Sequence, residues 1–302
     1  WSILPAEILI VDSSAVKPII SKIFTDFCDD QIISFKVIEK NNLYPGKARN
    51  VGIQSASYPV LAFLDISTIP SQKWLEVAWK EINTKKIDGI WGSTVYKANS
   101  WFHTIIRAVT FGNLPIITLP GSLINAKVFE TSGLFIGSTR AGEDADWMSR
   151  VALHNFKFIE STEHATYNGL TEMTFLRLIK KWYRNYAFSA KLPYLNAHKD
   201  VYFYFVAFFL MAVAFNWNNL SYDYTLSGWN INSFAYIPNI TKVSILFFAS
   251  MYISARCIYL PFRKGASLSF LFLNMPAIIL LSIILDMVKV SAFCHARFFQ
   301  VK

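Results

Sequence analysis

Three acidic residues close together are the side chains of this chain best suited to chemistry. Glu143, Asp144 and Asp146 come directly before an apolar helical pattern. Negative side chains are favoured at a helix N-terminus by the free N–H groups and the macrodipole, so helix capping is one explanation of the cluster. A catalytic site is the other explanation, because a positioned carboxylate can act as a general base.

Two further acids each follow a short apolar run of the kind that forms a buried strand. Asp12 follows residues 8–11, and Asp65 follows residues 60–64. Ligands of open α/β sheets bind outside the carboxyl ends of the strands, so we expect these two acids to share a site. Between them, residues 46–50 carry a glycine and two cations, Lys47 and Arg49, at the beginning of a helical pattern.

Strand and helix patterns alternate through the first hundred residues. Strands are predicted at residues 8–11, 32–38, 60–64 and 89–96, and helices at residues 18–27, at 47–56 and after Pro70. In the helix after Pro70, the apolar stripe consists of Trp74, Leu75, Ala78 and Ile82. The alternation predicts an α/β domain with a mostly parallel sheet.

The C-terminal third of the chain is much more apolar than a soluble domain requires. The chain has 302 residues, of which 53% are hydrophobic and 16% aromatic, and its last hundred residues contain two acids. Three apolar runs, at about 201–217, 240–260 and 268–288, approach the length of a membrane span, although buried core helices are an alternative. Asn274 and Pro276 interrupt the third run. Two alternatives to a third span therefore remain: a re-entrant segment, or a tail that lies on the membrane surface.

Positive charges flank the apolar runs unevenly. Residues 218–239 contain no Lys or Arg, whereas Lys180, Lys181, Arg184, Lys191 and Lys199 precede the first run and Arg263 and Lys264 follow the second. The positive-inside rule predicts an integral membrane protein with its α/β domain on the cytoplasmic side.

The net charge of +9 is interpreted as attraction to membrane lipids rather than to nucleic acid, because no RNA-binding signature or basic arm is present. Residues 175–190 are amphipathic, which predicts either a helix in the membrane interface or an ordinary helix on the α/β domain.

Two ordered blocks carry a resemblance to a known family. The segment PGKARNVGIQSASYPVLAFLDISTIPSQKWLE, residues 45–76, resembles a basic loop and ARN helix that lead to a strand with metal-site acids. The segment LPGSLINAKVFETSGLFIGSTRAGEDADWMSRV, residues 119–151, resembles an acceptor-side block that ends in an ED motif. Residues 5–190 are therefore similar to a membrane-anchored family-two glycosyltransferase of the GT-A fold.

The resemblance implies how the chain is divided. A GT-A nucleotide-sugar-binding domain is expected at residues 1–172, an amphipathic interfacial segment at 173–200, and an α-helical transmembrane region with two to three spans at 201–302. The chain begins with Trp1 close to a predicted strand, so the first strand and helix of the family are expected to be missing. We therefore expect low activity from these 302 residues alone.

The resemblance also implies roles for the acids and the cations. Asp144 is the expected general base, with Glu143 and Asp146 shaping its electrostatic field or binding the acceptor. The expected contacts of the nucleotide sugar are Asp12, Lys47, Arg49 and Asp65. Asp65 and, more weakly, His164 are the candidate metal ligands.

The chain departs from the family pattern at three places. Asp65-Ile66-Ser67 stands where the family has Asp-x-Asp, so a Mn²⁺ or Mg²⁺ ion is expected to bind more weakly. A serine at position 13 stands where a second Asp is usual. Asn168 aligns with a His that serves as an extra metal ligand in many relatives, which is why His164 is a weak candidate.

The expected function is that of an inverting glycosyltransferase. A sugar would move from a nucleotide-diphosphate donor to a hydroxyl acceptor at the cytoplasmic membrane face, in glycan, glycolipid or cell-envelope polysaccharide synthesis. A lipid-linked acceptor is one candidate. The chain lacks the QxxRW signature of processive synthases. The alternative is a catalytically degenerate glycosyltransferase-like membrane scaffold or binding protein.

Overall fold

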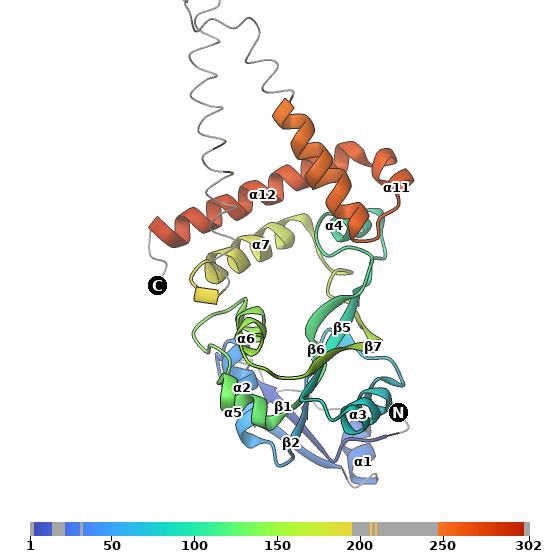
Figure 1. Cartoon of the computed structure of the whole chain (residues 1–302), viewed down its shortest axis with the longest axis vertical. Coiled ribbons are helices and arrows are strands. Elements are labelled where there is room, and N and C mark those ends of the chain that lie inside the picture. The colour runs from blue at the N-terminus through green and yellow to red at the C-terminus, as the bar shows by residue number, and fades with distance from the viewer. Residues whose placement is uncertain are drawn as a thin grey trace, which may run out of the picture.

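The computed structural model describes residues 3–13, 22–30, 33–194, 206, 209 and 247–298. An α/β core lies at one end of these residues, and a layer of helices lies across it (Figure 1). The predicted span at 201–217 falls almost wholly outside the described residues, as does the start of the span at 240–260.

The N-terminal part forms a small parallel sheet. Strand β1 (Glu7–Asp12) pairs with β2 (Ser34–Glu39), with Asp12 opposite Glu39. Helix α1 (Lys22–Asp30) lies between them in the chain, and residues 18–21, where the sequence pattern predicted its start, lie outside the described residues. The parallel pairing is the one that the βαβ pattern predicted.

The main sheet has five strands in the order β3-β6-β5-β7-β4. Their bounds are β3 Val60–Ala62, β4 Thr68–Ile69, β5 Gly89–Tyr96, β6 Ile116–Asn125 and β7 Phe158–Tyr167. Strands β5 and β7 are parallel, whereas the β3–β6, β5–β6 and β4–β7 pairs are antiparallel. Together with the β1–β2 pair, these strands form a mixed α/β architecture.

Strand β6 was not predicted from the sequence, and its backbone shows why. The register of β5 against β6 shifts between Ile90 and Gly92, opposite Pro120 and Gly121. Gly121 has a φ of +87°, and a Cβ at Gly92 would collide with the Pro120 carbonyl. A bulge built from Pro and Gly breaks the period-2 alternation by which strands are recognised.

Four helices cover the α/β core. They are α2 (Pro45–Ser55), α3 (Trp74–Lys85), α5 (Ala126–Ser132) and α6 (Glu143–Val151). The predicted stripe of α3 is confirmed, because all four of its members are buried. Trp147 of α6 is fully buried and stacks on Phe129 of α5 with the ring centroids 4.5 Å apart, which fixes α6 against the core.

The helical layer combines segments from distant parts of the chain. It contains α4 (Trp101–Val109), α7 (Phe175–Ser189), the π-helix η1 (Ile253–Tyr259), α10 (Leu260–Arg263), α11 (Leu268–Leu273) and α12 (Met275–Phe298). One hydrophobic cluster joins α4 and α7 to η1, α11 and α12, with Ile106, Leu178, Leu271 and Leu285 at its centre. Helices α7 and α12 run side by side across the top of the core (Figure 1).

The third predicted span is interrupted where the sequence indicated. Helix α11 ends at Leu273 and α12 begins at Met275, with Asn274 between them accepting a hydrogen bond from Trp101 Nε1 at 2.7 Å. Within the described residues, α12 alone is long and apolar enough to cross a membrane.

A buried polar network ties α4 to the C-terminal helices. The guanidinium of Arg256 pairs with Asp286, with Nε 3.0 Å from Oδ2, and donates to the carbonyl of Val109 at 3.1 Å. Lys289 and Tyr252 also donate to Asp286. The α/β core and the helices that follow it are therefore held together by directed bonds as well as by apolar packing.

Candidate active site

Arg49 lies at the centre of the candidate site and joins three elements. From α2, its Nη1 donates to Glu143 Oε1 at 2.6 Å and its Nη2 donates to Asp65 Oδ1 at 3.2 Å. Glu143 begins α6, and Asp65 follows β3. The sequence predicted all three residues at the site, and the structure brings them into direct contact.

The start of α2 reaches the loop before α6 because residue 46 is a glycine. A Cβ at Gly46 would collide with the carbonyl oxygen of Ile136 and would lie 3.1 Å from the Glu143 side chain. One turn later, the Asn50 amide accepts from the N–H of Phe135 at 2.9 Å and donates to its carbonyl at 2.8 Å. The PGKARN segment therefore fixes both the loop and the acids that follow it.

The electrostatics of this cluster are dominated by its acids. Burial opposes the charge on Arg49, but Asp65, Glu143 and Asp144 together raise the pKa of Arg49 above its usual value. Burial also raises the pKa of Glu143, and the neighbouring Asp144 raises it further, although Arg49 partly offsets both effects. One guanidinium thus faces three carboxylates and does not neutralise them all.

The two other acids of α6 differ sharply in their surroundings. Asp144 is partly exposed, and its Oδ1 accepts the N–H of Ala145 at 2.8 Å. Asp146 is fully buried, and its Oδ2 pairs with Arg150 Nε at 3.0 Å, while Arg150 also donates to the carbonyls of Ser132 and Leu134. The acceptor contact expected of Asp146 does not fit this placement, because its carboxylate faces the protein interior.

The expected nucleotide contacts lie on two further elements. Asp12 ends β1, against which α2 packs: a Cβ at Gly52 would lie 3.5 Å from Val11. Lys47 is an exposed residue of α2 beside Gly137. Arg49 already pairs with Asp65 and Glu143, and its expected contact with the nucleotide sugar stays a prediction.

The donor set around Asp65 does not fit a metal ion that the protein alone holds. Asp65 already pairs with Arg49, Ser67 supplies a neutral hydroxyl, and the backbone N–H of Asn168 donates to the Ser67 carbonyl at 3.0 Å. His164 lies within β7 and forms a 2.9 Å hydrogen bond with Ser93, which does not support its expected role as a ligand. No group of three potential ligands occurs among the described residues.

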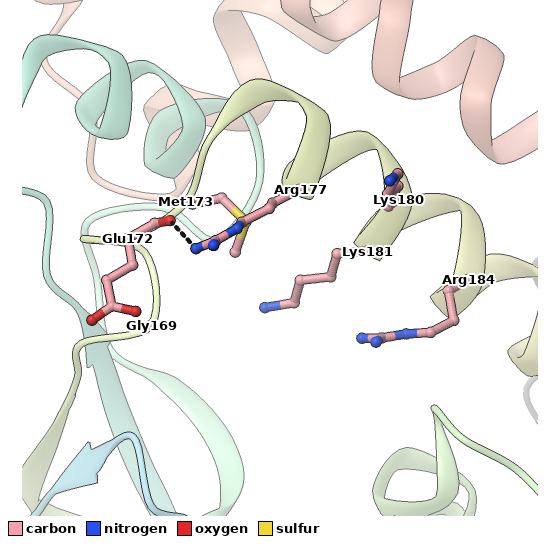
Figure 2. A pocket seen from close by; sticks show the side chains of 7 residues that line it. All are labelled: Gly169, Glu172, Met173, Arg177, Lys180, Lys181 and Arg184. Atoms are coloured by element: carbon pink, nitrogen blue, oxygen red, sulfur yellow. Dashed lines mark hydrogen bonds between the residues drawn. The ribbon is translucent and has the colours of Figure 1, made fainter.

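The structure adds residues that sequence reasoning assigned to the membrane surface. A pocket of about 400 Å³ is lined by Gly169, Glu172, Met173, Arg177, Lys180, Lys181 and Arg184. Figure 2 shows Lys181 and Arg184 extending from α7 into the same space. The i, i+4, i+7 spacing of Arg177, Lys181 and Arg184 is a helical-face signal that could have identified them.

Tyr96 and Tyr167 connect this pocket with the acids. Their ring centroids are 4.8 Å apart, and Lys181 Nζ lies 3.5 Å from the Tyr167 hydroxyl. Burial raises the pKa of Tyr96 above its usual range, and Tyr167, Asp144 and Asp65 raise it further. The acids therefore act on a ring that belongs to the same cluster as Lys181.

Comparisons with solved structures support the fold. The chain is similar to the mannosyltransferase PcManGT from Pyrobaculum calidifontis in complex with GDP-Man and Mn²⁺, at 12% identity and a TM-score of 0.55, over 98% of this chain and 79% of that chain. Weaker likeness is found to S. aureus TarS, at 13% identity and a TM-score of 0.37, over 65% of this chain. The chain spans 37% of the length of TarS.

Sequence comparisons agree with the fold. A search of curated proteins finds no significant match. Residues 2–142 match the family described as Glycosyl transferase family 2. These residues include β1, the Arg49 helix and Asp65, and they end immediately before Glu143. Residues 2–142 therefore correspond to a glycosyl transferase family 2 domain, and the fold is of the GT-A type.

Proposed function

We propose that this protein is an inverting glycosyltransferase that moves a sugar from a nucleotide-diphosphate donor to a hydroxyl acceptor, with Asp144 as the general base. The observation that carries the proposal is the placement of Asp144, which is a partly exposed carboxylate at the start of α6 beside the buried Arg49 cluster. The ligands of the PcManGT structure, GDP-Man and Mn²⁺, support a nucleotide-sugar donor as the class of substrate.

The chemistry follows from this placement. The acceptor hydroxyl attacks the anomeric carbon, its proton passes to the Asp144 carboxylate, and the bond from the anomeric carbon to the diphosphate breaks with its electron pair leaving on the diphosphate. The N–H of Ala145 holds one carboxylate oxygen of Asp144, which orients the other as the proton acceptor. Attack from the side opposite the leaving group inverts the anomeric centre.

Glu143, Arg49 and Asp65 position this base rather than react themselves. Glu143 is 5% exposed and precedes Asp144, so its bond to Arg49 fixes the first turn of α6. Asp65 remains partly exposed while it pairs with the same guanidinium, which leaves an oxygen for the donor ribose or for a cation. Asp12 and Lys47 would contact the nucleoside side of the donor.

A divalent cation would bind at this site together with the donor phosphates and not before the donor binds. Mn²⁺ and Mg²⁺ take about six oxygen ligands, and Asp65 offers one carboxylate that Arg49 already shares. Phosphate oxygens would complete the coordination of such an ion. The role of the ion there would be to neutralise charge on the leaving diphosphate.

The acceptor is proposed to be membrane-associated, and the catalytic domain is proposed to face the cytoplasm. Helix α12 is long and apolar enough to cross a membrane, and α7 packs along it. The positive flanks of the apolar runs support the cytoplasmic side. A lipid-linked acceptor in glycan, glycolipid or cell-envelope polysaccharide synthesis fits an active site directly beneath such helices.

Two linked measurements test the proposed function. The detergent-solubilised protein, with any native N-terminal segment restored, is heated with UDP, GDP, CMP or dTDP, with and without Mn²⁺. One of these nucleotides should raise the unfolding temperature, because a ligand that binds the folded state stabilises it. The matching nucleotide sugars are then incubated with a membrane-lipid extract, and release of the free nucleotide should depend on both lipid and Asp144.

The alternative is a degenerate scaffold that binds a nucleotide or partner without turnover. Ser67 and Ser13, at positions where the family usually has acids, are the observations that favour it. Nucleotide binding without lipid-dependent release of the nucleotide would support this alternative. If no nucleotide raised the unfolding temperature, the proposal that the donor is a nucleotide sugar would be contradicted.

A further inference from the structure

The pocket beneath α7 carries far more positive than negative charge. Of its lining residues, Arg177, Lys180, Lys181 and Arg184 are cations, and Glu172 is the one carboxylate. Arg177 donates to the backbone carbonyl of Glu172 at 3.3 Å (Figure 2). The pocket has a volume of about 400 Å³, which is large enough for a small ligand.

Two of these cations are held without a carboxylate partner. Lys181 Nζ lies over the rings of Tyr167 and Phe111, at 5.5 and 5.9 Å from their centroids. Arg184 makes weak 3.4 Å contacts with Asn185. Among the described residues, the ion pairs of this protein include neither Lys181 nor Arg184. Both side chains are therefore positioned but not neutralised.

The environment of Arg184 favours an anion. Burial lowers the pKa of Arg184, and repulsion from Arg140 lowers it further. Arg140 lies in the loop immediately before α6, two residues before its N-cap Gly142. The two like charges thus repel each other, and a bound anion would relieve that repulsion.

Geometry connects the pocket with the acids as well. Tyr167 contacts Lys181 on one side and Tyr96 on the other, and Tyr96 is influenced electrostatically by Asp144 and Asp65. A sugar joined to a diphosphate is a ligand of matching chemistry, because it combines an anionic part, suited to the cations of the pocket, with a neutral part, suited to contact with these rings.

We propose that Lys181 and Arg184 bind the diphosphate of the nucleotide-sugar donor and supply the positive charge that Asp65-Ile66-Ser67 cannot recruit through a protein-held metal. This inference rests on the proposed function for the identity of the donor. It requires that diphosphate binding persist when divalent cations are removed. Charge-assisted hydrogen bonds from Lys and Arg to phosphate are strong enough for that purpose.

The test is calorimetric titration of the detergent-solubilised protein, with any native N-terminal segment restored, with UDP, GDP, dTDP and inorganic pyrophosphate, in EDTA. We expect binding by at least one nucleoside diphosphate in EDTA, with the Kd falling by less than about a hundredfold when Mn²⁺ replaces EDTA. Lys181→Ala and Arg184→Ala should each raise the Kd by about tenfold or more, as expected for loss of one ionic contact. Lys181→Arg should keep the Kd within about threefold of wild type.

Lys80→Ala is the matched control, because it removes one charge from an exposed position on α3. Its Kd should equal that of the wild type. Equal Kd values for Lys80→Ala and Lys181→Ala, absence of pyrophosphate and nucleotide binding in EDTA, or a Kd that falls a hundredfold with Mn²⁺ would each overturn the inference. Unfolding temperatures of all variants distinguish lost binding from lost folding.

A parallel titration separates the donor from a phosphate-bearing lipid. Vesicles of phosphatidylcholine with and without a polyprenyl monophosphate serve as the probe. If the α7 variants lost binding to the polyprenyl phosphate but kept their affinity for the nucleoside diphosphate, the pocket would belong to the acceptor and the inference would fail. Because all these readouts are equilibrium binding, they remain informative even when no transfer is detected.

Discussion

At the scale of single residues, the decisive arrangement is one guanidinium among three carboxylates. Arg49 is anchored from α2 and holds Glu143 and Asp65, which belong to different segments. Glu143 is buried, so its charge is tolerated only because of that contact. Asp144, the next residue, stays accessible. The site therefore uses one acid to fix the helix start and leaves its neighbour available for chemistry.

The first prediction separates these acids by their chemistry. Asp144→Asn should lower the rate of sugar transfer by about 10²–10⁴-fold, the typical contribution of a positioned base, with nucleotide affinity within about threefold of wild type. Its unfolding temperature should be nearly unchanged, because Asn keeps the bond from the N–H of Ala145. Steady-state transfer kinetics and a thermal melt provide the two readouts.

Asp146→Asn is the matched control within the same helix. It weakens a buried pair with Arg150, so it should lower the free energy of unfolding by about 1–3 kcal/mol while the transfer rate stays within a few fold. The assignment of the base fails if Asp144→Asn and Asp146→Asn have similar rates.

The second prediction concerns Arg49 and pH. Arg49→Met removes the cation that lowers the pKa of Glu143, so the raised pKa of the buried carboxyl should rise further. A carboxyl group whose pKa is higher in the folded than in the unfolded state contributes its full stabilisation of the folded protein at pH values below its unfolded-state pKa. That contribution is lost as the pH rises through its folded-state pKa. The loss of unfolding free energy, about 2–3 kcal/mol at pH 8, should therefore be smaller at pH 5.

Denaturation in detergent at the two pH values measures this difference. Lys85→Met breaks an exposed pair with Glu81 and provides the control, with an expected loss of about 0.5 kcal/mol or less at either pH. A loss for Arg49→Met that was as small as the loss for Lys85→Met would show that the cluster does not need its cation.

Sequence reasoning found the members of this cluster but not their partners. Residue type and motif order identified Glu143, Asp65 and Arg49, and the structure brings them together. The burial of Asp146 could not be predicted, because it depends on Arg150 reaching the carbonyls of Ser132 and Leu134. Pairings across 16 to 18 residues of loop and helix are a property of the tertiary structure and leave no periodic pattern.

At the scale of elements, the close approach of α2 to the loop before α6 sets the geometry of the site. The two glycines of α2 differ in what surrounds them. At Gly46 a side chain would collide with backbone, whereas at Gly52 it would make an ordinary contact with Val11 at 3.5 Å. Gly46 is thus required by packing, and Gly52 is not.

The third prediction uses these two glycines as a matched pair. Gly46→Ala should destabilise the protein by about 1–3 kcal/mol, because the loop at Ile136 must shift, and it should also weaken nucleotide binding. Gly52→Ala should stabilise it by about 0.4–1 kcal/mol through the lower entropy of the unfolded chain. Thermal unfolding of the two variants side by side gives the sign, and the same sign for both would contradict the close approach.

The secondary-structure elements of the first hundred residues were predictable from the sequence, whereas the elements after them were less predictable. Strands β1, β2 and β5 and helix α3 carry clear apolar patterns with recognisable ends. Strand β6 carries a bulge with Pro and Gly, and α4 buries its apolar face against helices more than 140 residues later in the chain. Local patterns indicate that a face is apolar but not which element covers it.

At the scale of the whole molecule, the α/β core and the helices after it share one hydrophobic cluster. Helix α4 contacts α12, and Arg256 donates to the carbonyl of Val109. The α7 pocket therefore lies beneath a layer whose outer side chains are apolar. Those side chains include Leu268, Phe272 and Leu273 of α11 and Leu280, Ile283 and Met287 of α12.

The fourth prediction is that this outer face contacts lipid while the α/β core does not. Leu273 is 83% exposed on α11, and Leu153, which follows α6, is 68% exposed. Two such leucines are alike in type and exposure, but an apolar patch around Leu273 would be unfavourable in water and favourable in a bilayer. A photoreactive benzophenone residue at position 273 should crosslink to phospholipid in reconstituted vesicles, whereas the same residue at position 153 should not. Equal crosslinking at both positions would place the membrane elsewhere, and the proposal that the α7 pocket lies directly beneath lipid would have to be abandoned.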